Sequence, residues 1–449
     1  MGNEKEYIEI FDRHRQLIEE NSAALLNEKR AEAIQKFKAL GFPGRKDEEY
    51  LRSDAAKLFA ADYGMNLGRI KANAAPHDSF TCEVPNLRAH QEFIVNDSYC
   101  PPPANISPMP EGVLLGSLNE FAKTHRELIL PYYNTQAGSG DSIAQFNTTF
   151  TQDGLFLYIP KGTKVEETIQ LVTILHTNIE QMSNRRILII LEEGAEANLL
   201  ICDHAASDKK TLSLQTAEVF LGRSATLNLF EIEETGYNNN RLSQTYIKQQ
   251  AGSRLNHCNI TLTNGFTRNS TKVTLTGEGA EANLTGLAIC DKQQHTDNHT
   301  LIEHKVGHCT SNELYKYILD EQSCGVFSGK MLIQPDAQHT VSQQTNRNLC
   351  LTDCARMYAQ PQLEIYADDV KCSHGSTVGQ LDNNALFYMQ QRGIPLDEAR
   401  HLLMYAFAGE IIENITIEPI RERLHMLIEK RFRGELNRCK GCTLCKKQL

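Results

Sequence analysis

The chain has 449 residues, of which 23% are charged and 41% hydrophobic, and its formal net charge is −10. This composition is typical of a soluble globular protein, and the length predicts about three domains. The acidic balance argues against a nucleic-acid-binding protein, which usually carries a basic surface, and no run of about 18 apolar residues predicts a membrane span. Thirteen cysteines behind a charged N-terminus indicate reduced thiols, so we expect a cytoplasmic protein.

The N-terminal part is expected to be a helical region with a connector, over residues 1–140. Apolar residues recur at helical spacing up to about residue 60, with a loop at Gly41–Gly44. They include Ile8, Phe11, Leu17, Ile18, Leu25 and Leu26. Residues 75–140 are rich in Pro, Asn and Ser, which predicts an irregular connector with short strands.

Residues 141–392 are expected to form one β-rich domain. Short runs of strand-forming residues alternate there with Gly, Asn and Asp turns. The sequence of Glu193–Leu199 recurs unchanged at Glu278–Leu284, and Ile-Cys-Asp follows each copy. Glycines recur every 27 to 30 residues, at Gly194, Gly222, Gly252, Gly279 and Gly307.

This period predicts a parallel β-helix. One period is long enough for two strands and two turns, and each coil buries its apolar strand faces only against neighbouring coils. Glycine supplies the positive φ that a corner between sheets requires. We therefore expect the five glycines to stack along one edge. The alternative is an antiparallel β-sandwich with coincidental glycine spacing.

The C-terminal part is expected to contain a helical domain, over residues 393–437. Pro395 suits a first helical turn, and two helical apolar stripes follow. The first stripe contains Leu396, Ala399, Leu402, Leu403, Ala406, Phe407, Ile411 and Ile415, and the second Ile420, Leu424, Leu427, Ile428 and Phe432. Such stripes form either a core or a partner surface, and the sequence leaves both open.

No enzyme signature is recognisable, since phosphate-loop, dinucleotide, nucleophile-elbow and HExxH patterns are all missing. The strongest candidate for metal binding is Cys372 with His374, because residues two apart on a strand point to the same face. Thiolate and imidazole suit iron, copper or zinc. Two ligands do not hold a metal firmly, so a partner would complete the site. From these residues alone, a buried Cys beside a turn His is the favoured interpretation.

The last twelve residues, 438–449, form a Cys-rich tail. Cys439, Cys442 and Cys445 have CxxCxxC spacing, similar to the first three ligands of a ferredoxin-type motif. Neighbouring Lys and Arg residues would favour the thiolates. The alternative is a flexible basic segment with reactive thiols.

Several segments together resemble the SufB/SufD family, the scaffold proteins of SUF iron–sulfur cluster assembly. These are Asp153–Gly162, His299–His304, Gly325–Gly329, Ala337–Thr340, Gln343–Asn346, Pro361–Gly375 and Phe387–Gly393. Met389, where SufB-like chains tend to carry Cys, favours the SufD branch. Cys350, Cys354 and the CxxCxxC tail depart from the family pattern.

The resemblance implies a mainly β fold, with a right-handed parallel β-helix core between an N-terminal helical region and a C-terminal helical domain. It also implies a non-enzymatic scaffold that pairs with SufB through the coils near residues 350–385 and docks the ATPase SufC through the helices after residue 395. A transient iron–sulfur cluster, or iron, would be shared between Cys372, His374 and SufB. A homodimer is possible without SufB.

Two other classes of function stay open from the sequence. A carbohydrate-active β-helix enzyme would share the fold, but it would usually be secreted and show clustered carboxylates on one face. A stand-alone metal- or thiol-binding protein would depend on the CxxCxxC tail alone.

Overall fold

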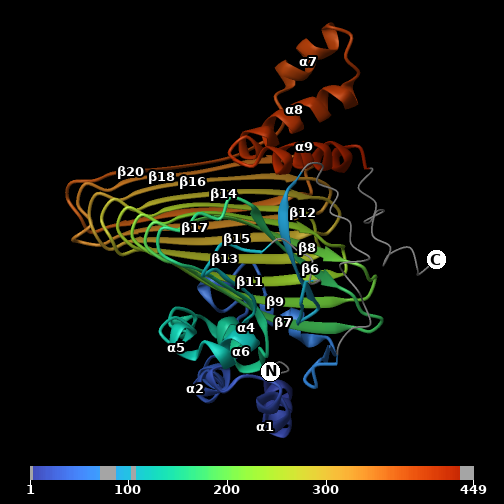
Figure 1. Cartoon of the computed structure of the whole chain (residues 1–449). Helices are drawn as coiled ribbons and strands as arrows, with labels where there is room; N and C mark the ends of the chain where they lie inside the picture. The colour runs from blue at the N-terminus through green and yellow to red at the C-terminus, as the bar shows by residue number, and fades with distance from the viewer. Residues whose placement is uncertain (1–3, 71–86, 103–107, 435–449) are drawn as a thin grey trace.

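The computed structural model describes residues 4–70, 87–102 and 108–434, and within them the chain forms a mainly β solenoid (Figure 1). From β5 onward the chain alternates between two sheets, so that odd-numbered strands join sheet A and even-numbered strands join sheet B. Sheet A contains β1 (Gly64–Met65), β4 (Leu114–Ser117), β5 (Gly154–Ile159), β7 (Gln181–Leu191), β9 (Thr211–Leu221), β11 (Asn239–Gln249), β13 (Phe266–Leu275), β15 (His295–His304), β17 (Cys324–Ile333) and β19 (Arg356–Ile365). Sheet B contains β2 (Ala89–Val95), β3 (Ser98–Cys100), β6 (Thr168–Leu175), β8 (Glu196–Ala205), β10 (Thr226–Glu234), β12 (Arg254–Thr263), β14 (Glu281–Cys290), β16 (Thr310–Leu319), β18 (Val341–Cys350) and β20 (Lys371–Gly379).

Successive coils stack in parallel register, as the repeat predicts. Glu281 of β14 lies beside Thr310 of β16, which lies beside Val341 of β18. Alternate side chains of each strand point inward, and apolar residues such as Leu199 and Leu284 form the main interior core. The parallel β-helix is therefore confirmed, and the antiparallel sandwich is excluded.

One corner of the solenoid is built from left-handed residues, but two of the predicted glycines are displaced from it. The positions with positive φ at this corner are occupied in chain order by Gly162, Gly194, Ser224, Gly252, Gly279, His308 and His339. Gly222 precedes the left-handed position by two residues, and a Cβ on it would lie 2.8 Å from the backbone carbon of Glu192. Gly307 precedes its left-handed neighbour by one residue. These two glycines therefore serve close backbone approach rather than the turn.

The N-terminal helices cover the outer face of sheet A at the lower end of the solenoid (Figure 1). These elements are α1 (Glu4–Glu20), α2 (Ala24–Leu40), η1 (Glu48–Tyr50), η2 (Ala55–Ala60), α4 (Leu118–Thr124), α5 (Arg126–Ile129), η3 (Ala137–Ser139) and α6 (Ser142–Phe150). Within the predicted connector, residues 75–140, the structure forms α4, α5 and η3 besides the short strands, and α6 lies inside the stretch that the sequence assigns to the β-rich domain. Every residue of α6 is buried between α2 and the sheet, so its polar side chains are satisfied inside the protein, as Gln145 and Asn147 are by donating to the carbonyl oxygens of Ala137 and Arg185.

The C-terminal helices follow the solenoid, and α8 and α9 pack over its sheet B. They are α7 (Asn383–Gln391), α8 (Leu396–Ile412) and α9 (Glu418–Phe432). The last strand ends at Gly379, so the predicted boundary at residue 392 places α7 with the strands, whereas Figure 1 shows it projecting beyond them. Across the three described ranges, we find no helix with the length and apolar character needed to span a bilayer.

Candidate functional site

The upper end of the solenoid is open. β19 pairs with β17, and β20 pairs with β18, and in the described chain each is the terminal strand of its sheet (Figure 1). Most residues of β20 are exposed, in contrast to the strands below it. The outward edges of both strands therefore present unpaired backbone N–H and C=O groups.

Cys372 and His374 lie on this open end, on one face of β20. Cys372 is in register with Ser342 and His374 with Gln344 of β18. Ser342 and Gln344 are 2% and 0% exposed and point into the solenoid. Because in-register residues of parallel neighbours share a face, both candidate ligands continue interior columns of side chains. The same-face placement is what the spacing predicts.

The surroundings of the two candidate ligands differ. The Cys372 side chain packs against a small corner cluster of Ile333, Ala337 and Ala367, and burial raises the pKa of its thiol. His374 is exposed to solvent. The thiol is therefore anchored at the corner, whereas the imidazole is open to an incoming group.

The donor atoms fit part of a metal site. Thiolate and imidazole both bind iron, but a closed tetrahedral site takes four ligands. Among the residues whose positions the structure gives, no group of three or more His, Cys, Asp and Glu side chains could hold a metal ion. Cys372 and His374 therefore fit iron or an iron–sulfur cluster only together with ligands from elsewhere, and their role stays a prediction.

The remaining cysteines divide into core thiols and surface thiols. Cys202, Cys258 and Cys290 are buried, which confirms that they are core residues. Cys350 ends β18 and Cys354 lies in the next turn, near the open end, where Cys354 is exposed. The tail thiols Cys439, Cys442 and Cys445 lie outside the described residues.

Polar residues beneath the candidate ligands were missed by the sequence reasoning. Ser311 and Glu313 of β16 occupy the interior positions held by Ala282 and Leu284 one coil below. The Oγ atoms of Ser311 and Ser342 are 2.8 Å apart, and Gln344 donates a 2.6 Å hydrogen bond to Glu313. Extending the repeat through β16 would have revealed these replacements, because the strands stay in register.

The C-terminal hairpin of α8 and α9 is fastened to the outer face of sheet B by apolar and ionic contacts. Met404, Ile411 and Leu424 pack against strand residues such as Phe230 and Ile260. The face of α8 that is buried differs from the predicted stripe, since Leu402 is 42% exposed. Part of the predicted stripe is therefore surface.

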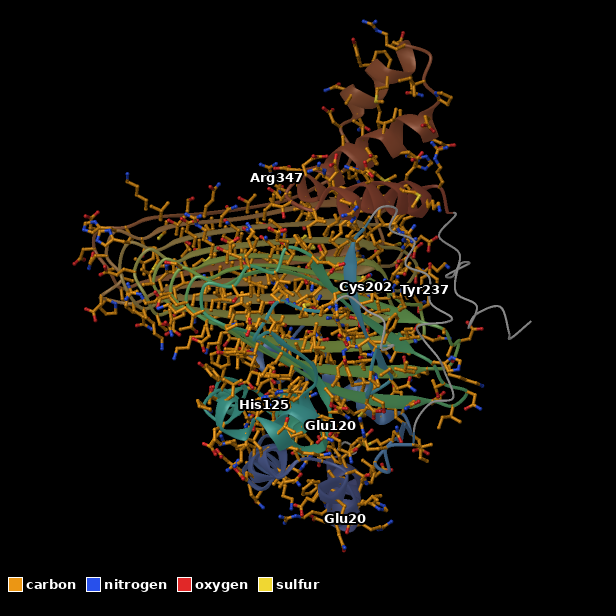
Figure 2. The ribbon with its side chains drawn as sticks, viewed as in Figure 1. Glu20, Glu120, His125, Cys202, Tyr237 and Arg347 are labelled. Carbon is orange, nitrogen blue, oxygen red and sulfur yellow. The ribbon has the colours of Figure 1, made fainter. Side chains whose placement is uncertain are left out.

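One buried lysine marks this junction. Lys316 of β16 donates to the Phe407 carbonyl oxygen at 2.8 Å, pairs with Glu410 and lies 4.2 Å from the centre of the Phe407 ring. Burial lowers the pKa of Lys316, and Glu410 opposes that shift. Arg347 also pairs with Glu410 at 3.1 Å, and Figure 2 shows it where the last strands meet the helices. α8 is thus held at a defined position on sheet B.

The helix α7 presents an apolar surface. Phe387 and Tyr388 are 63% and 59% exposed, and α7 projects away from the strands (Figure 1). Leu396 at the start of α8 is also exposed. Adjacent exposed aromatic residues of this kind are typical of protein interaction surfaces.

Comparison with known proteins identifies the family. The SufBD core domain of the SUF iron–sulfur cluster assembly system matches residues 174–407, and the SufBD N-terminal region matches residues 1–171. The chain therefore belongs to the SufB/SufD family of iron–sulfur cluster assembly proteins.

Relatives of the chain include SufD proteins. The chain is 29% identical over 417 residues to a SufBD family iron–sulfur cluster assembly protein of Synechocystis, covering 91% of both chains. It is 32% identical over 247 residues to the iron–sulfur cluster assembly protein SufD of Escherichia coli, covering 54% of this chain and 58% of that protein. It is 24% identical over 343 residues to SufD of Bacillus subtilis, covering 74% of this chain and 77% of that protein.

Proposed function

We propose that this chain is a non-enzymatic scaffold subunit of a cytoplasmic SUF complex. In this proposal the open end pairs with a SufB-type solenoid, and α7 with α8 docks a SufC-type ATPase. The observation that carries it is the open end, where two unpaired strand edges lie beside Cys372 and His374. A second solenoid placed end to end would continue both sheets and could supply the missing ligands.

Three features support the separate parts of the proposal. The exposed edges of β19 and β20 favour a partner with the same fold, because their backbone groups can pair only with another strand. The aromatic residues of α7 supply an apolar anchor for a second partner. Thiols such as those of Cys258, Cys290, Cys324 and Cys354 are free, which suits a reducing compartment.

The pairing surface is tested by Val378→Glu, because Val378 is a 54% exposed residue of β20 at the open end. A charge placed in an apolar seam without a partner is costly. We expect the variant to fold as an isolated chain but to lose the complex with SufB, measured by co-purification and light scattering. Gly379→Ala is the matched control, since a Cβ there meets no atom within 4 Å. Normal assembly of the glutamate variant would refute pairing at this end.

The metal role is tested by His374→Ala and Cys372→Ala in the assembled complex. We expect normal complex formation with reduced cluster content, measured by iron and sulfide analysis after anaerobic purification. Ser373→Ala is the control on the opposite face of β20. Wild-type cluster content in both alanine variants would remove these residues from the site.

The ATPase surface is tested by Phe387→Asp. Because the Phe387 side chain is exposed, we expect the variant to fold, so a loss of SufC binding would report on docking alone. Glu127→Gln on the exposed surface of α5, remote from α7 and α8, is the control. Unchanged binding of SufC by the aspartate variant would place the docking surface elsewhere.

A further inference from the structure

A column of three interior-facing residues connects the buried core to His374. Glu313 of β16, Gln344 of β18 and His374 of β20 are in register in successive coils. Adjacent strands of a sheet lie about 4.8 Å apart, so neighbouring members of the column are within reach of a side-chain hydrogen bond. We call these residues the Glu313 column.

The lower two members of the column are fixed by one hydrogen bond. Gln344 Nε2 donates to Glu313 Oε2 at 2.6 Å, and both side chains are fully buried. Because Gln344 gives its amide nitrogen to Glu313, its carbonyl oxygen is the atom left for another contact. That oxygen, Gln344 Oε1, is buried and has no hydrogen-bond partner among the residues that the structure describes.

Gly329 of β17 provides the space that the Gln344 side chain occupies. A Cβ at Gly329 would lie 2.3 Å from Gln344 Nε2 and 2.7 Å from Phe327 Cζ. The amide could not keep this position beside any larger residue. The glycine, the glutamate and the glutamine therefore form one local arrangement that holds the Gln344 amide in a fixed orientation.

An unpaired buried carbonyl oxygen is unfavourable, by about 1–3 kcal/mol. Such a group is retained where a donor is supplied in a functional state. The next residue of the column is His374, and a neutral imidazole has one N–H donor and one nitrogen lone pair. Histidine metal ligands usually donate the ring N–H to a fixed oxygen, which sets the tautomer and the ring orientation.

We propose that Gln344 is a positioning residue for His374. Gln344 Oε1 accepts the N–H of the His374 imidazole, and the lone pair of the other ring nitrogen is then directed out of the open end. Glu313 acts one step further away by holding the Gln344 amide in this orientation. This inference rests on the proposed metal role of His374 and deepens it.

The first test measures the tautomer of His374 in the isolated chain, without a metal or a partner. Long-range proton–nitrogen correlation spectra of 15N-histidine-labelled protein at pH 8 report which ring nitrogen carries the proton, and His374→Ala assigns the signal. We expect one tautomer in the wild type and a mixture in Gln344→Met, which keeps the side-chain length but removes the acceptor. A mixture in the wild type, or one tautomer in Gln344→Met, would overturn the proposal.

A second pair of variants keeps Gln344 and changes only its support. Glu313→Gln retains an acceptor for the Gln344 amide and should preserve the single tautomer, whereas Glu313→Met should give the mixture. Equal spectra for these two variants would overturn the role of Glu313. Circular dichroism confirms that each variant is folded, and the pair keeps the test decisive if Gln344→Met does not fold.

A third readout separates this inference from the proposed function. In the assembled complex we expect Gln344→Met to lower cluster content by about tenfold, as for other residues that orient a metal ligand. A changed tautomer with wild-type cluster content would refute the metal role of His374 but not its orientation by Gln344. An unchanged tautomer would refute the orientation and leave the metal role to the His374→Ala experiment.

Discussion

Replacing Glu313 with glutamine should remove part of the pH dependence of folding. Glu313 is fully buried, and burial raises the pKa of its carboxyl from 4.5 to about 7, with only partial relief from Gln344 and Thr300. The folded protein therefore holds a proton that the unfolded chain has already lost between pH 4.5 and 7. Stability from this group is complete below pH 4.5 and is lost as the pH rises to about 7.

The size of this effect follows from the pKa difference between the folded and unfolded states. One pKa unit corresponds to about 1.4 kcal/mol, so the complete loss for Glu313 is about 3 kcal/mol, and about 2 kcal/mol of it falls between pH 5.5 and pH 8. Glutamine does not titrate and can still accept a hydrogen bond from Gln344. We therefore expect Glu313→Gln to lose about 2 kcal/mol less stability than the wild type over this interval.

Urea titrations of the isolated chain at pH 5.5 and pH 8 measure this difference. Other buried acids also titrate, among them Glu233, whose pKa burial raises to about 7, so the wild-type change must be compared with that of the variant. Glu111→Gln, at an exposed position, is the control and should follow the wild type. Parallel pH dependence in Glu313→Gln and the wild type would refute the raised pKa.

Two further substitutions test the architecture by urea unfolding. Gly279→Ala should destabilise the chain by about 1–2 kcal/mol, because the φ of Gly279 is 71°, a left-handed conformation. Gly375→Ala is the control and should be nearly neutral, because a Cβ there meets no atom within 4 Å. Equal effects of the two substitutions would contradict the corner assignment. Ile428→Ala should lower the free energy of unfolding by about 2–5 kcal/mol, because this α9 side chain is fully buried against sheet B. Leu402→Ala on the exposed side of α8 is the control and should change stability by less than about 0.5 kcal/mol. A neutral Ile428→Ala would show that the hairpin is not docked on sheet B.

The solenoid could be predicted because glycines and a seven-residue segment recur in the sequence at a nearly constant period. The exact corner positions could not, because a left-handed turn accepts residues other than glycine. Ser224 and His308 occupy that position, while Gly222 and Gly307 lie nearby for steric reasons. The spacing of the glycines gives the period of such a fold. The position of each corner residue depends on the register between neighbouring strands, which the hydrogen bonds between coils determine.

The sequence predicted some of the helices and missed others. The helix α1 shows a clear apolar periodicity, whereas the short α6, with five polar residues among its nine, lies in the stretch that the sequence assigns to the β-rich domain. In α8 the apolar residues surround most of the helix, so the sequence could not tell which face meets sheet B. The structure buries the face containing Met404, Ala408 and Ile411.

The candidate ligands were accessible to sequence reasoning, but their support was not. Cys372 and His374 share a face because of the two-residue period of a strand, which needs no tertiary information. Glu313 and Gln344 lie 31 residues apart and contact each other only because the coils stack. The positions of these two residues in the sequence alone do not indicate that their side chains are in contact.

The two ends of the solenoid differ in a way that limits how many copies can be joined. At the lower end the sheets finish in the short antiparallel strands β3 and β4, and α4 packs against β4 and β5. Among the strands that the structure describes, those of the upper end, β19 and β20, are the ones that offer parallel edges to another solenoid. A junction made there brings together two upper ends and leaves two closed lower ends outside. Assembly through these edges therefore stops at a pair and cannot extend into a fibre.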